Sequence, residues 1–160
     1  MTNESMNTKL SAARPRRRTI LGMIAALACG LLPLRALAAE WNKPAFEAHA
    51  LPEALKAIGA TSIAESDKIE LKAPEIAENG AIVPVEITSR IPGTEAVYII
   101  AEKNPQPLVA EFDFTGATEP FISTRIKMGE TARVRVIVRA GGKFYATARE
   151  VKVTIGGCGG

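Results

Sequence analysis

Histidine and cysteine, the side chains most often used to hold metals, are nearly absent from this sequence. The 160 residues contain one histidine, His49, and two cysteines, Cys29 and Cys158. A structural or catalytic zinc site usually needs three or four such ligands, so we expect no metal centre and assign His49 to the surface or to helix packing. A Ser-His-Asp set, a P-loop and a dinucleotide-binding glycine motif are also missing.

Aromatic residues make up only 5% of the chain, so the core must be built from Val, Ile, Leu and Ala. The net charge of +3 is misleading, because residues 1–38 hold six of the 20 basic side chains and one of the 17 acidic ones. The rest of the chain therefore has a net charge of about −2, which removes the electrostatic support for a nucleic-acid-binding role. The length suits one domain.

The N-terminal segment is typical of an export signal. Arg17 and Arg18 are followed by one residue and then two apolar ones, a pattern that resembles the twin-arginine signal. An apolar run of about 15 residues, 20–34, comes next, and an A-x-A motif ends at Ala38. We expect cleavage between Ala38 and Ala39 and export to the periplasm in the folded state.

Two other interpretations of this segment are weaker. A membrane anchor would need about 20 apolar residues, and this run is shorter and ends at a cleavage motif. A lipoprotein modified at Cys29 is disfavoured, because apolar residues continue beyond it and Ala26 stands where a large aliphatic residue is usual. Removal of residues 1–38 would leave Cys158 as the single thiol of the mature protein.

The mature chain begins with a helical pattern and continues with strands. Residues 44–59 read as helix with an apolar stripe of Leu51, Leu55 and Ile58, divided by Pro52 into two short helices and ended by Gly59. Seven segments then show strand patterns: 68–73, 82–91, 95–102, 107–114, 121–128, 131–139 and 143–155. We expect an all-β fold, an immunoglobulin-like antiparallel β-sandwich of about seven strands over residues 39–155, with a short N-terminal helical segment.

Particular residues refine this expectation. Pro84 predicts that its strand lies at an edge or contains a bulge, and residues 95–102, apolar on both faces, predict a central strand. In segment 107–114, Leu108, Ala110, Phe112 and Phe114 are expected to share one face. Gly141-Gly142 predicts a tight hairpin. In the last strand the apolar positions change from even to odd numbers, which predicts a β-bulge near Arg149-Glu150.

The last five residues carry the chemistry that the rest of the sequence lacks. Cys158 is flanked by Gly156, Gly157, Gly159 and Gly160. A glycine run cannot build a core and has large conformational freedom, so residues 156–160 predict a thin, flexible arm that presents a thiol to other proteins. The arm contains no His, Lys or Arg that would favour the thiolate, so partner enzymes must activate it.

Two alternatives to a covalent carrier stay open. The lone thiol could bind copper or another thiophilic metal, although one cysteine without neighbouring Met or His is a poor site. It could also form an intermolecular disulfide in a structural dimer, as an odd cysteine in an exported protein allows.

The glycine-flanked Cys158, the twin-arginine signal and the Glu78-Asn79-Gly80 turn before Val83-Pro84-Val85 together resemble the SoxY family, sulfur carriers of the Sox thiosulfate-oxidation system. The resemblance implies an immunoglobulin-like carrier without a cofactor and without enzymatic activity of its own. It implies a heterodimer with SoxZ. It also implies that SoxAX joins thiosulfate to Cys158 as a cysteine S-thiosulfonate, that SoxB releases sulfate, and that SoxCD oxidises the remaining sulfur in some organisms.

Two further features have ordinary interpretations. Arg133, Arg135 and Arg139 share a strand face, which favours a solvated surface over a contact with an acidic partner. Trp41, near the start of the mature chain, is expected to be a packing anchor and not a ligand platform.

Overall fold

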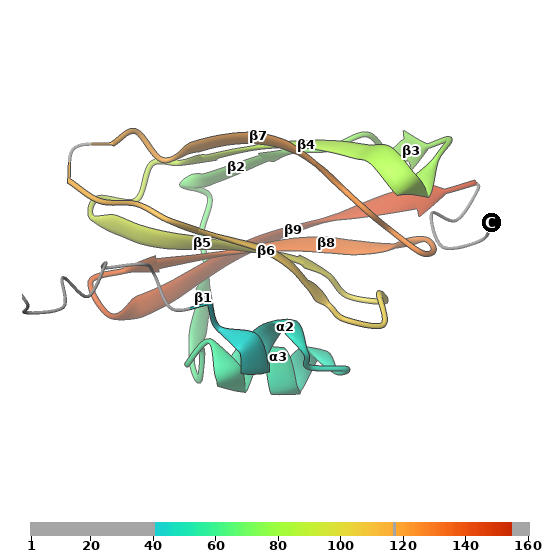
Figure 1. Cartoon of the computed structure of the whole chain (residues 1–160). Helices are drawn as coiled ribbons and strands as arrows, with labels where there is room; N and C mark the ends of the chain where they lie inside the picture. Colours follow the sequence, from blue (N-terminus) through green and yellow to red (C-terminus); the bar gives the residue numbers. More distant parts are fainter. Residues whose placement is uncertain (1–40, 117, 155–160) are drawn as a thin grey trace, which may run out of the picture. The chain divides into compact units, whose positions relative to one another are not determined.

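Two β-sheets face each other, and two short helices cover the outer face of the larger sheet (Figure 1). The structure is a computed structural model that describes residues 41–116 and 118–154. Its elements are α2 (Lys43–Phe46), α3 (Leu51–Ala57), β1 (Ile63–Glu65), β2 (Ile69–Lys72), β3 (Ile76–Ala77), the 3-10 turn η1 (Gly80–Ile82), β4 (Val83–Ser89), β5 (Thr94–Ala101), β6 (Leu108–Asp113), β7 (Phe121–Ile126), β8 (Ala132–Ala140) and β9 (Lys143–Val153). No helix in this part of the chain has the length and hydropathy needed to cross a bilayer.

The larger sheet has the strand order β1-β9-β8-β5-β6, with β3 paired to the second half of β9, and the smaller sheet has the order β2-β4-β7. The chain alternates between the sheets at its start, since β1 and β3 belong to the larger sheet and β2 and β4 to the smaller one. The predicted immunoglobulin-like sandwich is confirmed. The purely antiparallel arrangement is not, because β1 and β3 run parallel to β9.

All seven predicted strands are present, and β1 and β3 are additions. These two strands have three and two residues, too few for an alternating pattern to stand out from the sequence. The predicted hairpin at Gly141-Gly142 is also confirmed, with both residues at positive φ.

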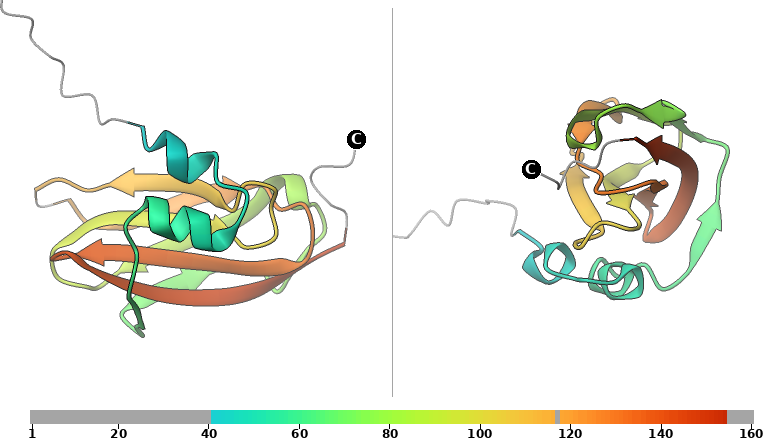
Figure 2. Two further views of the ribbon diagram at one scale, coloured as in Figure 1. Left: turned by 90° about the horizontal axis from the view of Figure 1, so that it is seen from below. Right: turned by 90° about the vertical axis from the view of Figure 1, so that its right-hand side faces the viewer.

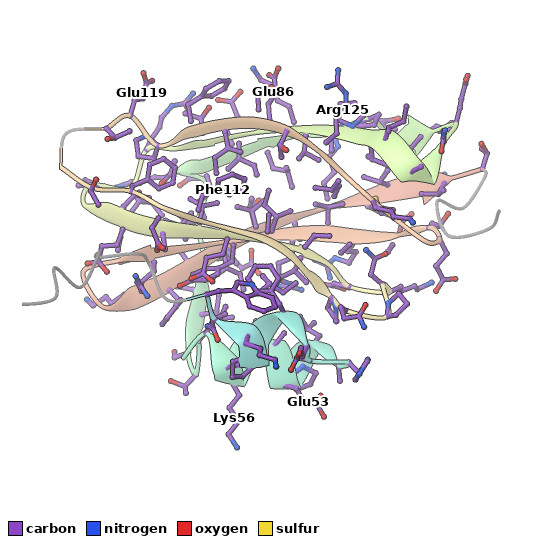
Figure 3. All side chains as sticks on the ribbon, in the orientation of Figure 1. Glu53, Lys56, Glu86, Phe112, Glu119 and Arg125 are labelled. Atoms are coloured by element: carbon purple, nitrogen blue, oxygen red, sulfur yellow. The ribbon has the colours of Figure 1, made fainter. Side chains whose placement is uncertain are left out.

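The main core fills the space between the two sheets. Val83, Val85 and Ile87 of β4 meet alternate residues of β5 and β8, and all are fully or almost fully buried. Phe112 also points into this space, whereas Glu86 and Arg125 point outward from the smaller sheet (Figure 3). This alternation is the pattern that the sequence predicted, because successive side chains of a strand point to opposite faces.

The two helices lie over the outer face of the larger sheet (Figure 2), and a second apolar layer fills the space between the helices and this sheet. Ala54 and Ile58 from the helical segment pack with Tyr98, Ile137 and Ala146 from the central strands. The larger sheet is therefore buried on both faces. This explains why β5 is apolar on both faces from Ala96 to Ala101 and confirms it as a central strand, between β8 and β6.

The bulge predicted near Arg149-Glu150 is absent, and the same apolar layer explains the sequence pattern that suggested it. The register between β8 and β9 runs unbroken from Ala132 opposite Val151 to Ala140 opposite Lys143. Phe144 and Ala146 face the helices, while Val151 faces the smaller sheet. The apolar positions change from even to odd because the helices cover one face of the first half of β9, whereas the smaller sheet covers the opposite face of its second half.

A bulge does occur, but between β5 and β6. Ile99 pairs with Ala110 and Ile100 with Leu108, so Val109 is the extra residue. The prediction that Leu108 shares a face with Ala110, Phe112 and Phe114 is therefore wrong: Leu108 packs toward the helices and the other three toward the smaller sheet.

Pro84 is not on an edge strand, since β4 lies between β2 and β7. β2 ends at Lys72 opposite Glu86, so Pro84 has a strand partner only on the β7 side, at Arg125. A proline is tolerated there because no second strand pairs with β4 at that position.

The helical segment divides as expected, but the break comes before Pro52. Residues 47–50 separate α2 from α3, and Pro52 occupies the first turn of α3, where its missing N–H breaks no helical hydrogen bond. Gly59, at φ 78°, follows the end of α3 and confirms the predicted stop.

Candidate functional site

The candidate site begins where β9 ends, at Val153, five positions before Cys158 in the sequence. β9 has 11 residues, and its last two residues pair with β3. Ile76 lies opposite Lys152, and Ala77 lies opposite Val153. Lys152 donates its backbone N–H to the carbonyl of Glu75 over 2.9 Å. The strand is held on this side until its last residue.

Side chains fix the same strand end. The backbone N–H of Val153 donates to Thr131 Oγ1 at 2.9 Å, and Thr154 Oγ1 donates to the carbonyl of Glu78 at 3.0 Å. The Thr154 N–H donates to the carbonyl of Ala77 at 3.1 Å. With the fully buried Val151 below them, these bonds make the end of β9 a fixed anchor.

The predicted attachment residue, Cys158, lies outside the described residues, as do Gly156, Gly157, Gly159 and Gly160. Cys158 is four positions after Thr154 in the sequence. An extended chain spans at most about 3.3–3.6 Å per residue, so the Cys158 backbone can lie no more than roughly 14 Å from Thr154. The anchor therefore limits where the thiol can act.

The segment that holds the anchor is the turn predicted at Glu78-Asn79-Gly80. Asn79 Oδ1 accepts the N–H of Ala81 at 2.8 Å and caps η1, while the carbonyl of Gly80 accepts the N–H of Met128 at 2.7 Å. Two large apolar side chains stand out of this segment, Ile76 with 59% and Ile82 with 58% of its surface exposed.

Charged groups near the anchor are few and exposed. Arg149 lies 3.6 Å from Glu75 in an exposed ion pair, and the side chains of Glu78 and Lys152 are exposed. Lys152 is the closest basic residue to Cys158 along the chain, six positions away.

A second candidate is a groove of about 830 Å³ beside α2, lined by residues of α2, the β5–β6 connection and the start of β6. Trp41 lines it with 64% of its surface exposed and its ring centroid 5.7 Å from that of Phe46. The prediction that Trp41 packs into the structure is therefore wrong, because its ring lies beside one aromatic ring but is not buried. His49 is exposed, as expected, with Nδ1 3.2 Å from the carbonyl of Pro105.

The three arginines of β8 do not form a uniformly solvated face. Arg133 is exposed, but Arg135 is mostly buried and binds Glu102 at 2.8 Å, with Glu65 at 3.8 Å. Arg139 lies 3.2 Å from Glu95 and 3.9 Å from Asp113. These acidic partners come from β1, β5, β6 and the residue after β5, so sequence spacing alone could not reveal them.

A polar cluster crosses β8, β5 and β6 on the helix side of the sheet. Arg139 Nη1 donates to the Tyr98 hydroxyl at 3.2 Å. Burial raises the pKa of Tyr98 to about 12, against the opposing charge of Arg139. Burial, followed by the negative charge of Asp113, also raises the pKa of Glu111, and the hydrogen bond from the Tyr98 hydroxyl opposes this. We assign this cluster to the cohesion of the sheet.

Comparison with known proteins shows the family to which the chain belongs. The family model described as "Sulfur oxidation protein SoxY" matches residues 54–158, more than half of the chain. The structure of the sulfur carrier protein SoxY from Chlorobium limicola f thiosulfatophilum is 46% identical, with a TM-score of 0.60 over 66% of this chain and 96% of that one. The chain belongs to the SoxY family.

The family match starts inside α3 and ends on Cys158, so it includes the whole anchor of β9 and the residue predicted as the attachment point. The signal residues Arg17, Arg18, Ala38 and Ala39 lie before it and outside the described residues. The domain limits at 38 and 155, the signal and the arm remain predictions.

Other likenesses are weaker than the SoxY match. A superoxide reductase (neelaredoxin) from Ignicoccus hospitalis is 17% identical, with a TM-score of 0.45 over 54% of this chain and 80% of that one. A PKD domain of an M14-like peptidase from Thermoplasmatales archaeon SCGC AB-540-F20 is 14% identical, with a TM-score of 0.38 over 53% and 91%. No curated protein sequence matches the chain. Among the described residues, no group of three His, Cys, Asp or Glu side chains is placed to hold a metal ion.

Proposed function

We propose that this SoxY-family protein is a covalent carrier of sulfur intermediates in thiosulfate oxidation, with Cys158 as the attachment residue. The observation that carries the proposal is the family match that ends on Cys158, five positions beyond the end of β9, a strand end held by backbone and side-chain hydrogen bonds. A fixed anchor followed by a short glycine arm suits a thiol that swings between the active sites of several enzymes.

The chemistry at Cys158 has two balanced steps. In the first, the cysteine sulfur and the sulfane sulfur of thiosulfate form a bond, one proton leaves the thiol, and two electrons pass to the haem protein SoxAX. The product is a cysteine S-thiosulfonate. In the second, SoxB adds water across the S–SO₃ bond, releasing sulfate and a proton and leaving a cysteine persulfide. SoxCD, where present, oxidises that remaining sulfur.

The carrier itself is a substrate-bearing subunit and not an enzyme, and its only attached group is the sulfur cargo. The arm has no basic side chain, and Lys152 is six residues from Cys158. The thiolate that reacts must therefore be generated in the active site of each partner. SoxZ is the proposed permanent partner, in a heterodimer.

The proposed place of action is the periplasm. The twin-arginine pattern at Arg17 and Arg18 and the cleavage motif between Ala38 and Ala39 support export by the twin-arginine route. Because that route moves folded proteins, the sandwich and its SoxZ partner would fold before crossing the membrane.

Intact mass spectrometry of the protein from cells grown on thiosulfate tests the proposal. We expect a thiosulfonate or sulfane adduct on Cys158 in the wild type. Cys158→Ser should keep the same unfolding midpoint and lose both the adduct and thiosulfate oxidation. A copper ion bound to the purified protein, or a disulfide dimer as the only modification, would instead support the metal-binding or structural alternative.

A further inference from the structure

Two exposed isoleucines stand on the segment that holds the anchor of the arm. Ile76 belongs to β3, directly opposite Lys152 of β9, and Ile82 ends η1, six residues further along. They are two of the four large hydrophobic residues that are well exposed in the described part of the chain. Both lie in 76–82, the segment whose carbonyls at Ala77 and Glu78 bind Thr154.

The segment presents these side chains in fixed positions. Asn79 caps η1, and the bond from the Met128 N–H to the Gly80 carbonyl ties the segment to the β7–β8 connection. Ala77 beside Ile76 and Val83 beside Ile82 are buried. The exposed isoleucines are therefore anchored by buried neighbours and lose little conformational freedom when a partner covers them.

The length of the arm limits how far from this surface an enzyme can bind Cys158. Cys158 can extend at most about 14 Å from Thr154, and each residue that enters an enzyme's channel brings the channel mouth closer to the anchor. Ile76 lies one strand spacing, about 4.8 Å, from β9 at Lys152, two residues before Thr154. An enzyme that receives Cys158 must therefore bind close to the end of β9, and segment 76–82 lies directly beside that end.

We propose that Ile76 and Ile82 form a docking surface for the enzyme that hydrolyses the S–SO₃ bond of the Cys158 adduct. The proposal rests on the proposed carrier function. The matching enzyme surface is an apolar rim around a narrow channel, with polar groups facing the exposed Glu78 and Lys152. A permanent heterodimer partner does not suit this surface, because it would block the approach of enzymes that act in turn.

A matched control is available at the other end of the smaller sheet. Phe121 is also exposed, but it begins β7 opposite Thr88, whereas Ile126 at the other end of β7 pairs with Val83, the residue after Ile82. Five strand positions at about 3.3 Å each place Phe121 roughly 17 Å along the strand from this point. A substitution at Phe121 therefore removes similar exposed apolar surface away from the arm.

The experiment uses the full heterodimer loaded chemically with tetrathionate. The Cys158 thiolate displaces thiosulfate from tetrathionate and becomes the S-thiosulfonate, and intact mass confirms the loading. Release of sulfate by the purified hydrolase is then measured against carrier concentration. We expect the I76S/I82S double variant to raise KM at least about fivefold with kcat unchanged, and F121S to leave both unchanged. Ile82→Lys should also raise KM. Ile82 lies in η1 and pairs with no strand, so this substitution removes no strand pairing.

The outcomes separate the docking proposal from the carrier function. Failure of the hydrolase to act on the loaded wild type would overturn the carrier function and the docking proposal with it. Normal hydrolysis with equal KM for wild type, I76S/I82S and I82K would overturn the docking proposal alone. So would loss of the heterodimer on size exclusion in I82K, because the surface would then belong to the permanent partner.

Discussion

Thr154 donates its backbone N–H to the carbonyl of Ala77 over 3.1 Å, next to the parallel pair of Ala77 and Val153. This contact joins the end of the last strand to β3, a strand of two residues. Although β3 is short, it fixes the end of β9, which precedes the cysteine-bearing segment in the sequence. The predictions below follow from this anchor and from the two charged clusters of the larger sheet.

The anchor should loosen when Thr131 loses its hydroxyl. Thr131→Val removes the acceptor of the Val153 N–H and should cost about 1 kcal/mol of unfolding free energy. The amide of Val153 should exchange with solvent faster, which hydrogen exchange measures residue by residue. Thr61→Val, at an exposed position after α3, is the control. Equal Val153 exchange in both variants would show that the hydroxyl does not hold the strand end.

The glycine arm should be sensitive to stiffening beside the thiol. Gly157→Pro fixes φ near −65° at that position and removes the backbone freedom that lets the arm enter the channels of partner enzymes. We expect turnover of the Cys158 adduct by these enzymes to fall at least about tenfold. The alkylation rate of the thiol by iodoacetamide and the unfolding midpoint should not change. Gly160→Ala, beyond the thiol, serves as the control, and full turnover in the proline variant would argue against a swinging arm.

The Arg135–Glu102 pair should contribute to stability. Arg135→Ala leaves the mostly buried Glu102 carboxylate without its 2.8 Å partner, and we expect a loss of about 1–3 kcal/mol in urea unfolding. Arg133→Ala, an exposed neighbour on the same strand, should change stability by less than about 0.5 kcal/mol. Similar losses in the two variants would mean that the burial of Arg135 has no energetic consequence.

Glu111 should make the stability depend on pH. Its pKa in the folded protein is raised above its ordinary value of about 4.5, so the folded state binds the proton more tightly than the unfolded state. Its contribution is fully present below about pH 4.5 and is lost as pH rises through the folded pKa. Glu111→Gln, which does not titrate, should therefore gain stability relative to wild type between pH 4 and pH 7, as measured by urea unfolding. A difference that stays constant over this range would contradict the assignment.

Alternation of apolar residues predicted where strands lie, but not what covers them. In β4, Val83, Val85 and Ile87 face one core, and the pattern gave the buried face directly. In β9 the same reasoning led to a bulge that does not exist, because Phe144 and Ala146 are covered by helices that come from residues 43–57. A pattern along one strand reports burial, and it carries no information about which distant segment provides that burial.

The sequence by itself determined most of the local structure of this protein and supplied the proposal for its chemistry. The glycine-flanked Cys158, the seven longer strands and the stop at Gly59 follow from the properties of individual residues and short repeats. Only the tertiary structure decided that β3 holds the end of β9, that β4 is central despite Pro84, and that Arg135 meets Glu102. These features depend on pairings between residues 14 to 76 positions apart, and such pairings are set by how whole layers pack together.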